Sequence, residues 1–212
     1  LPCVEGRPTH CEPGQAANGA GLLMGGVSRL SQNGAKVHHH MGVAAFAEYT
    51  VAHRGSMVKV DSSLPFEEAA LFGCAVLTGV GAVVNTAKVS AGSTVAVVGL
   101  GGVGLNSVLG AVLAGAREII ALDIHDDKLQ MAKQLGATAI VNAKDADAIQ
   151  QVKELTKGGV DFAFEMAGSV HAMELAYRIT RRGGTTVTAG LPNPDARWQM
   201  QHVNLTAEER TI

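Results

Sequence analysis

Three glycines with a fixed spacing, Gly99, Gly101 and Gly104, lie near the middle of the chain. This G-x-G-x-x-G pattern suits a dinucleotide pyrophosphate, because a glycine backbone can approach a phosphate closely. In a chain with 26 glycines the pattern alone is weak. Here an apolar run over 94–98 precedes it and a helical pattern over 102–114 follows it, which is the order that such a site requires. We expect the N-terminus of that helix to offer free N–H groups to the phosphates.

An acidic residue, Asp123, stands at the end of the next apolar run. A carboxylate there accepts hydrogen bonds from the adenosine ribose and repels a 2′-phosphate, so NAD is favoured over NADP. Ile124 and His125 follow and supply no arginine to offset that repulsion. Lys128 could also reach the ribose, although a solvated helix lysine fits its position equally well. The alternative to a nucleotide site is an ordinary glycine turn beside a strand that happens to end in an acid.

Strand and helix patterns alternate regularly around these residues. The apolar strand runs are typical of strands buried on both faces, as in a parallel sheet. Five strands joined by four helices predict a doubly wound α/β fold. The strands are expected at 94–98, 118–122, 138–141, 161–164 and 185–189, and the helices at 102–114, 126–135, 146–156 and 170–179.

The first part of the chain has weaker patterns. Residues 1–35 are rich in Gly, Pro, Asn and Ser and predict loop. Alternating apolar residues at 46–51 and 57–60 predict short antiparallel strands. Helices are expected at 65–72 and 78–86, the first of them opened by a proline and two acids.

The composition and the net charge of the chain indicate which kinds of binding partner are not expected. A net charge of −2 gives no electrostatic footprint for nucleic acid or for an anionic membrane surface. No apolar run in the sequence reaches the roughly 18–20 residues that span a bilayer. Three cysteines are too few for a disulfide framework and favour a cytoplasmic location. We therefore expect neither a nucleic-acid partner nor a membrane partner.

Four segments taken together closely resemble the zinc-dependent medium-chain alcohol dehydrogenases. They are Gly73–Gly79, Gly92–Leu105, Ala121–Lys128 and Gly159–Glu165. The resemblance implies that residues 1–77 are the second half of a mainly β, GroES-like catalytic domain. It also implies that residues 78–212 are a Rossmann domain for NAD that lacks its last strand.

The resemblance assigns roles to residues near the reacting end of the coenzyme. Cys74 would be one of three protein ligands of a catalytic zinc, where the alternative is an ordinary small apolar residue. Thr78 would orient the substrate or the nicotinamide, and Val103 would pack against the nicotinamide ring. The backbone from Ala189 to Leu191 would lie near the carboxamide. Gly102 would join the neighbouring glycines in binding NAD.

Two further groups of residues, a pair of cysteines and a run of histidines, are of types that can bind metal ions. Cys3 and Cys11 have the last spacing of a family set of four structural-zinc cysteines, and we interpret them as an incomplete set, because two thiolates cannot close a tetrahedral site. The run His38-His39-His40 resembles a strand-entry segment, and we interpret it as structural, with adventitious metal binding as the alternative.

The resemblance implies an NAD- and Zn²⁺-dependent oxidoreductase that acts on small alcohols or aldehydes, as a homo-oligomer in its full-length form. Because the chain begins at Leu1 and two zinc ligands have no counterpart, we interpret it as a fragment with negligible turnover of its own. One alternative is a dehydrogenase of S-(hydroxymethyl)glutathione type. Another is an NAD-binding fragment or sensor without catalytic activity.

Overall fold

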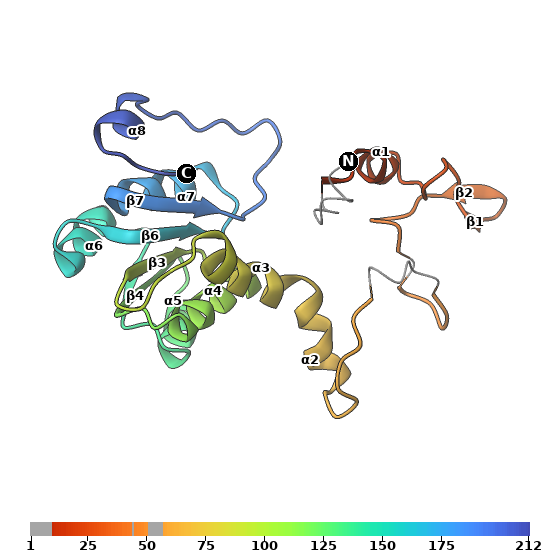
Figure 1. The fold of residues 1–212 in the computed structure, drawn as a ribbon, viewed down its shortest axis with the longest axis horizontal. Coiled ribbons are helices and arrows are strands. Elements are labelled where there is room, and N and C mark those ends of the chain that lie inside the picture. Colours follow the sequence, from red (N-terminus) through yellow and green to blue (C-terminus); the bar gives the residue numbers. More distant parts are fainter. Residues whose placement is uncertain (1–9, 44, 51–56) are drawn as a thin grey trace. The chain divides into compact units, whose positions relative to one another are not determined.

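The computed structural model describes residues 10–43, 45–50 and 57–212. The chain forms two compact units, Leu1–Ser62 and Ser63–Ile212, and each is treated by itself (Figure 1). The first unit contains helix α1 (Glu12–Gly19) and an antiparallel hairpin of β1 (Leu30–Gln32) and β2 (Ala35–Val37).

The prediction of loop over residues 1–35 was wrong at α1 and β1. Helix α1 begins with a proline in its first turn, where a missing N–H costs nothing, and with the acid Glu12. The hairpin turns at Asn33 and Gly34, whose φ angles of +52° and +78° are those that a tight two-residue turn requires. The Asn-Gly pair was therefore a hairpin signal in the sequence.

The strands predicted at 46–51 and 57–60 were also wrong for the residues that the structure describes. Residues 46–49 form a bend, and residues 50 and 57–60 belong to no helix or strand. Val51 lies outside the described residues. Alternation of apolar residues here does not reflect a buried strand face, because Phe46, Tyr49 and Val58 are all exposed.

The second unit begins with one continuous helix rather than the two that were predicted. It passes from α2 (Phe66–Leu71) through a π-helical segment, η3 (Phe72–Val76), into α3 (Leu77–Gly81) and a second π-helical segment, η4 (Ala82–Thr86). The segment Gly73–Leu77 is helical, and the residues at the ends of η3, Leu71 and Leu77, both have right-handed helical φ and ψ angles.

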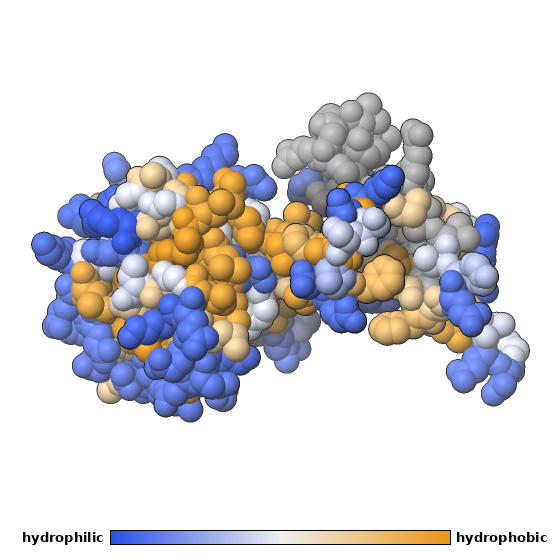
Figure 2. Space-filling view, turned by 90° about the horizontal axis from the view of Figure 1, so that it is seen from below, coloured by the Kyte–Doolittle hydropathy of each residue, from blue (hydrophilic) through white to orange (hydrophobic). Residues whose placement is uncertain are grey.

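This continuous helix is long and apolar enough to cross a membrane, by length and composition only. The helix has 21 residues, and its most apolar 18-residue window has a mean hydropathy of 1.7, which the sequence-based division into two helices concealed. Its second half is a packing element of the sheet-containing unit, since Gly79, Ala82 and Val83 are buried there. Figure 2 shows that apolar residues gather into a band over this unit, whose exposed apolar side chains include Leu77 and Leu113.

A close contact with α4 (Gly102–Leu113) holds the second half of that helix in place. A Cβ at Gly79 would overlap the carbonyl oxygen of Val103, and a Cβ at Gly110 would lie 3.1 Å from the Cα of Val80. The hydroxyl of Ser107, which is fully buried, donates to the carbonyls of Gly79 and Val103. Two glycines therefore let the two helices touch through their backbones.

The predicted doubly wound parallel sheet is confirmed. Its strand order is β5-β4-β3-β6-β7, and every neighbouring pair is parallel. The strands are β3 (Thr94–Val98), β4 (Glu118–Asp123), β5 (Ala139–Asn142), β6 (Val160–Glu165) and β7 (Thr180–Thr188). β7 begins five residues before its predicted start, because its first part follows directly from the preceding helix and is separated from the rest by a register shift against β6.

Helices cover both faces of this sheet, and each face has its own apolar cluster. α4 and α5 (Asp126–Gln134) pack on the face that carries Val95 and Val97. α6 (Ala148–Thr156) and α7 (Val170–Ile179) pack on the opposite face, which carries Ala96 and Val98. Successive residues of β3 thus point to opposite clusters and are all buried, as the apolar run predicted.

The last residues return to the edge of the sheet. After α8 (Val203–Ala207), Thr211 forms a parallel bridge with Thr185, and the backbone N–H of Thr186 donates to the Thr211 carbonyl over 2.9 Å. Arg210 donates to the Tyr177 carbonyl and lies over the Tyr177 ring. The final residues therefore lie at the position that a sixth parallel strand would take.

Candidate functional site: a glycine loop and an acid at the ends of the parallel strands

The glycine loop forms the turn from β3 into α4. Gly99 has a φ of +93°, and a Cβ on it would lie 2.7 Å from the backbone nitrogen of Ala167. A Cβ on Gly104 would overlap the carbonyl oxygen of Gly99. Both positions therefore require glycine for reasons internal to the fold, one for the tight turn and one for the close packing of α4 on the strand.

Gly101 differs from these two glycines, because nothing within the chain crowds it. It caps the N-terminus of α4 with extended backbone angles, and a Cβ on it would meet no heavy atom within 4 Å. Gly101 and Gly102 are both exposed. The space in front of the helix N-terminus is therefore open to an external group, and the N–H groups of the first turn are directed toward it.

Asp123 lies directly beside this loop. Its Oδ2 accepts a hydrogen bond from the backbone N–H of Leu100 over 2.7 Å, and its Oδ1 accepts one from the N–H of His125 over 2.9 Å. Asp123 is half-buried at the end of β4, and a carboxylate with two accepted bonds has lone pairs left for further donors. Lys128 lies half-buried one turn into α5.

A pocket of about 330 Å³ lies at the same end of the sheet, between the continuous helix and β7. Thr78 and Ala189, which the family resemblance had placed at the nicotinamide end, both line it. Val103 lies in the first turn of α4 and packs against the core cluster of that face. Leu191 is 95% exposed, and its backbone lies against Gly168.

A second pocket, of about 400 Å³, begins at Ile124, directly after Asp123. Both apolar and charged residues line it. The apolar ones include Ile149 and Leu175, and the charged ones include Lys144 and Arg178. The two pockets and the glycine loop all lie at the carboxyl ends of parallel strands. Ligands bind at this edge in open α/β sheets, where the strand order reverses.

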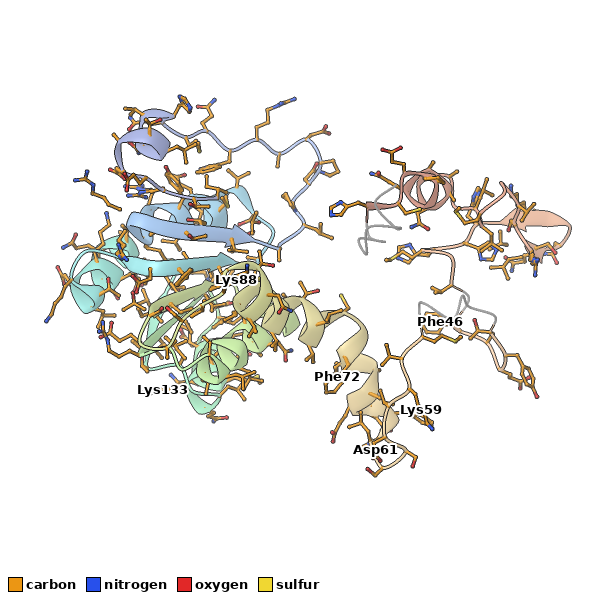
Figure 3. All side chains as sticks on the ribbon, in the orientation of Figure 1. Phe46, Lys59, Asp61, Phe72, Lys88 and Lys133 are labelled. Carbon is orange, nitrogen blue, oxygen red and sulfur yellow. The ribbon has the colours of Figure 1, made fainter. Side chains whose placement is uncertain are left out.

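Cys74 is exposed in the η3 segment, in the same helix as Thr78. Phe72, labelled in Figure 3, begins this segment. Within the described residues, no group of three or more His, Cys, Asp or Glu side chains could hold a metal ion. The residues present in the described part of the chain therefore do not form a complete zinc site around Cys74.

The other candidate metal ligands are not brought together either. Cys11 is a half-buried free thiol at the start of α1, and Cys3 lies outside the described residues. His39 is buried and accepts a hydrogen bond from the backbone N–H of Arg29 at its Nε2 over 3.3 Å. The His38 ring bonds the Ala20 carbonyl over 3.1 Å. These contacts favour the structural interpretation of the histidine run.

Sequence reasoning missed one residue of this region, the buried acid Glu165 at the end of β6. Its side chain accepts hydrogen bonds from the loop that follows β6 and from Thr188 at the end of β7. The signal was present in the sequence, because Glu165 ends an apolar strand run in the same way as Asp123. Its partners could not be read from spacing, since Thr188 is 23 residues away.

Comparison with known proteins assigns this arrangement to a class. A family profile described as zinc-binding dehydrogenase matches residues 102–212, more than half of the chain. The chain belongs to the zinc-binding dehydrogenase family. A Rossmann-type sheet with a glycine loop and an acid at the next strand end is the part of that family which this structure contains.

Individual relatives agree with the family assignment. An alcohol dehydrogenase class-3 from Oryza sativa subsp. japonica is 46% identical over 193 residues, which are 89% of this chain and 51% of the relative. An alcohol dehydrogenase zinc-binding domain protein from Burkholderia ambifaria is similar in structure, with a TM-score of 0.92, 33% identity and coverage of 100% of this chain and 58% of that one. Benzyl alcohol dehydrogenase from Acinetobacter calcoaceticus has a TM-score of 0.79 and 32% identity, over 96% of this chain and 58% of its own. The chain thus spans about half the length of the curated relative that it matches.

Proposed function

We propose that this chain binds NAD(H) as the coenzyme-binding part of an alcohol dehydrogenase, which oxidises a small alcohol reversibly to an aldehyde or ketone. The observation that carries the proposal is the pairing of Asp123 with the glycine loop through the N–H of Leu100. It puts an anionic acceptor beside an open helix N-terminus, and these are the two groups that ribose hydroxyls and a pyrophosphate require.

The proposed coenzyme contacts divide between its two ends. Gly99, Gly101, Gly102 and Gly104 would hold the pyrophosphate at the N-terminus of α4. Asp123 would hold the adenosine ribose, with Lys128 as a second contact. Open space at Gly101 supports the first assignment, and the remaining acceptor capacity of Asp123 supports the second.

The nicotinamide end would lie against Val103, Thr78 and the backbone from Ala189 to Leu191. When bound, the nicotinamide accepts a hydride from the alcohol carbon. The pocket that Thr78 and Ala189 share supports this assignment, because it lies at the same edge of the sheet as the glycine loop. Thr78 would orient the reacting groups with its hydroxyl.

The chain supplies only some of the zinc ligands that the family resemblance implies. Cys74 would be one ligand of a catalytic zinc, and Cys3 and Cys11 would belong to a structural-zinc set. The described residues hold no cluster of metal-ligating side chains, so we expect the chain by itself to show negligible turnover. A homo-oligomeric full-length form and the division into residues 1–77 and 78–212 remain predictions of the family resemblance, and a cytoplasmic location remains a prediction from the small number of cysteines.

The proposal is tested by calorimetric titration of the folded chain with NADH and, separately, with NADPH. We expect saturable binding of NADH and weaker binding of NADPH, because the Asp123 carboxylate repels a 2′-phosphate. No heat of binding with NADH, from a sample whose circular dichroism shows a folded α/β protein, would overturn the proposal.

A second measurement tests the expectation that the chain by itself has negligible turnover. Ethanol or benzyl alcohol is added with NAD and Zn²⁺, and the absorbance of NADH is followed. We expect no rate above the background. A rate that Cys74→Ser abolishes would show that the chain completes a catalytic site and would contradict the expected inactivity.

A further inference from the structure

A single buried carboxylate connects two of the loops at the proposed coenzyme site. Glu165 is 2% exposed, and acids are rarely buried to this degree unless all their lone pairs find partners. Its Oε1 accepts from the backbone N–H groups of Ala167 and Gly168, over 2.9 and 2.6 Å, and its Oε2 accepts from the Thr188 hydroxyl over 2.7 Å. All three donors are uncharged.

The backbone of the same residue makes a second connection to β7. The Glu165 carbonyl accepts from the N–H groups of Ala189 and Gly190, over 3.0 and 3.3 Å. A Cβ on Gly190 would overlap the nitrogen of Gly168 and lie 2.8 Å from Oε2 of Glu165. Glu165 therefore fastens the loop after β6 to the end of β7 with both its side chain and its main chain.

Both fastened segments border the groups assigned to the coenzyme. Ala167 lies against Gly99, since a Cβ on that glycine would be 2.7 Å from the Ala167 nitrogen. On the other side, Thr188 and Ala189 line the pocket that contains Thr78. A movement of either loop would thus change the glycine loop on one side and the nicotinamide-end pocket on the other.

We propose that Glu165 is a positioning residue for NAD(H), because its buried carboxylate holds the loop after β6 and the end of β7 in the geometry that the coenzyme requires. This inference rests on the proposed function. Glu165 itself contacts no coenzyme. It acts through the backbone N–H groups of Ala167 and Gly168 and through Thr188.

The chemistry of the three donors predicts how variants behave. In Glu165→Gln the amide oxygen still accepts from both N–H groups, and the amide NH₂ donates to the Thr188 hydroxyl, so the fastening is kept. In Glu165→Leu the side chain has similar volume but no acceptor, and the N–H groups of Ala167 and Gly168 lose their partner. Thr188→Val removes one donor and keeps the shape of the side chain.

The control is Thr186→Val, the same substitution two residues earlier on β7, at a buried position whereas Thr188 is exposed. Thr186 is 1% exposed, and its hydroxyl bonds that of Thr180 over 2.8 Å, away from both loops. This variant should lower the stability of the fold without moving the coenzyme loops. It separates a positioning role from general destabilisation.

The experiment measures the Kd for NADH by fluorescence, together with amide hydrogen exchange at Ala167 and Gly168. We expect Thr188→Val to raise the Kd about three- to tenfold, as loss of one hydrogen bond does. Glu165→Leu should raise the Kd more than about tenfold, whereas Glu165→Gln and Thr186→Val should stay within about twofold of the wild type. Hydrogen exchange at the amides of Ala167 and Gly168 should become faster in Thr188→Val and in Glu165→Leu, and should be unchanged in Glu165→Gln and Thr186→Val.

Two outcomes would overturn the inference. One is an unchanged Kd in Thr188→Val, which still decides the matter if Glu165→Leu fails to fold. The other is a loss of NADH affinity in Thr186→Val equal to that in Thr188→Val, which would mean that the change in Kd reports only the stability of the fold. If the wild type does not bind NADH, the proposed function fails, and amide exchange still shows whether Glu165 and Thr188 hold the loop.

Discussion

The carboxylate of Asp123 and the backbone N–H of Leu100 are 2.7 Å apart and hydrogen-bonded, although 23 residues separate them. The bond ties the end of β4 to the glycine loop after β3. The neighbouring Gly101 leaves open space, since a Cβ on it would meet no atom within 4 Å. In the proposed function this one side chain would have two tasks, to shape the loop and to provide an acceptor for a ribose.

These two tasks of Asp123 can be separated by substitution. In Asp123→Asn the amide oxygen can still accept from Leu100, but the amide NH₂ cannot accept from the N–H of His125, and the negative charge is lost. We expect the loop to stay intact while the preference for NADH over NADPH falls by about tenfold, because the 2′-phosphate is no longer repelled. Asp123→Ala should lose NADH affinity as well. Calorimetry with both coenzymes measures this, and an unchanged preference in both variants would contradict the role.

The glycine loop offers a matched pair of alanine substitutions. Gly104→Ala places a methyl group on the carbonyl oxygen of Gly99 and should destabilise the fold by about 3 kcal/mol or more, since backbone must shift. Gly101→Ala meets no atom within 4 Å, so the free energy of unfolding should change by less than about 0.5 kcal/mol. NADH binding should nevertheless be lost in Gly101→Ala, because the methyl group takes the space of the pyrophosphate. Urea unfolding and NADH titration of both variants test the contrast.

The contact of the continuous helix with α4 gives a second pair. Gly79→Ala would overlap the Val103 carbonyl and bring a methyl group within 2.9 Å of the Ser107 nitrogen, at a cost of about 1–3 kcal/mol. Gly81→Ala has no neighbour closer than 3.8 Å and should stabilise the helix by about 0.5–1 kcal/mol. Thermal unfolding should therefore shift in opposite directions in the two variants. A shift in the same direction would mean that the helix does not pack on α4 in this way.

A hydrogen-bonded network at the opposite end of the sheet, around the half-buried Asp161, predicts a dependence of stability on pH. Burial raises the pKa of Asp161, but hydrogen bonds from the Thr94 N–H and hydroxyl and from Arg181, with the charge of that arginine, outweigh it and lower the pKa below its ordinary value of 3.8. A carboxyl with a depressed pKa stabilises the fold above its unfolded pKa, and that stability is lost as the pH falls through the folded value. The loss should therefore begin near pH 3.8 and continue below it.

Asp161→Asn tests this assignment. At neutral pH the variant should be less stable by about 1–3 kcal/mol, and the difference from the wild type should shrink as the pH falls below 3.8. Glu174→Gln is the control, because Glu174 pairs with Arg178 on the surface and such pairs contribute little. Urea unfolding from pH 7 to pH 3 gives both curves. A difference that does not vary with pH would contradict the assignment.

The sheet and the acid beside the glycine loop were predictable because their signals are local. A run such as Thr94–Val98 is buried on both faces, so every residue is apolar or bonded, and the run ends where the strand ends. Asp123 is recognised in the same way, as a polar residue directly after a buried run. The helix Val170–Ile179 was predicted with its observed bounds, and its N-cap, Ser169, bonds the N–H of Ala172.

The features that were missed depend on contacts between distant residues or on small local signals. The two helices predicted at 65–72 and 78–86 are joined in the structure, because residues 73–77 continue the helix through η3 into α3. Glu165 gave the same signal as Asp123, but its role follows only from partners on another strand. The hairpin at Asn33 and Gly34 was overlooked because the surrounding residues are polar and exposed, so alternation of apolar residues is absent.

The π-helical segment that contains Cys74 has a further meaning for protein engineering. A π-helical turn contains one more residue than an α-helical turn, and one residue corresponds to about 100° of rotation around the helix axis. Deleting a single residue between Cys74 and Thr78 would leave a continuous helix with the thiol turned by about a quarter of a circle relative to the hydroxyl. The extra residue thus determines the angle around the helix axis between the thiol of Cys74 and the hydroxyl of Thr78. A deletion or insertion of one residue would change this angle while the segment stays helical.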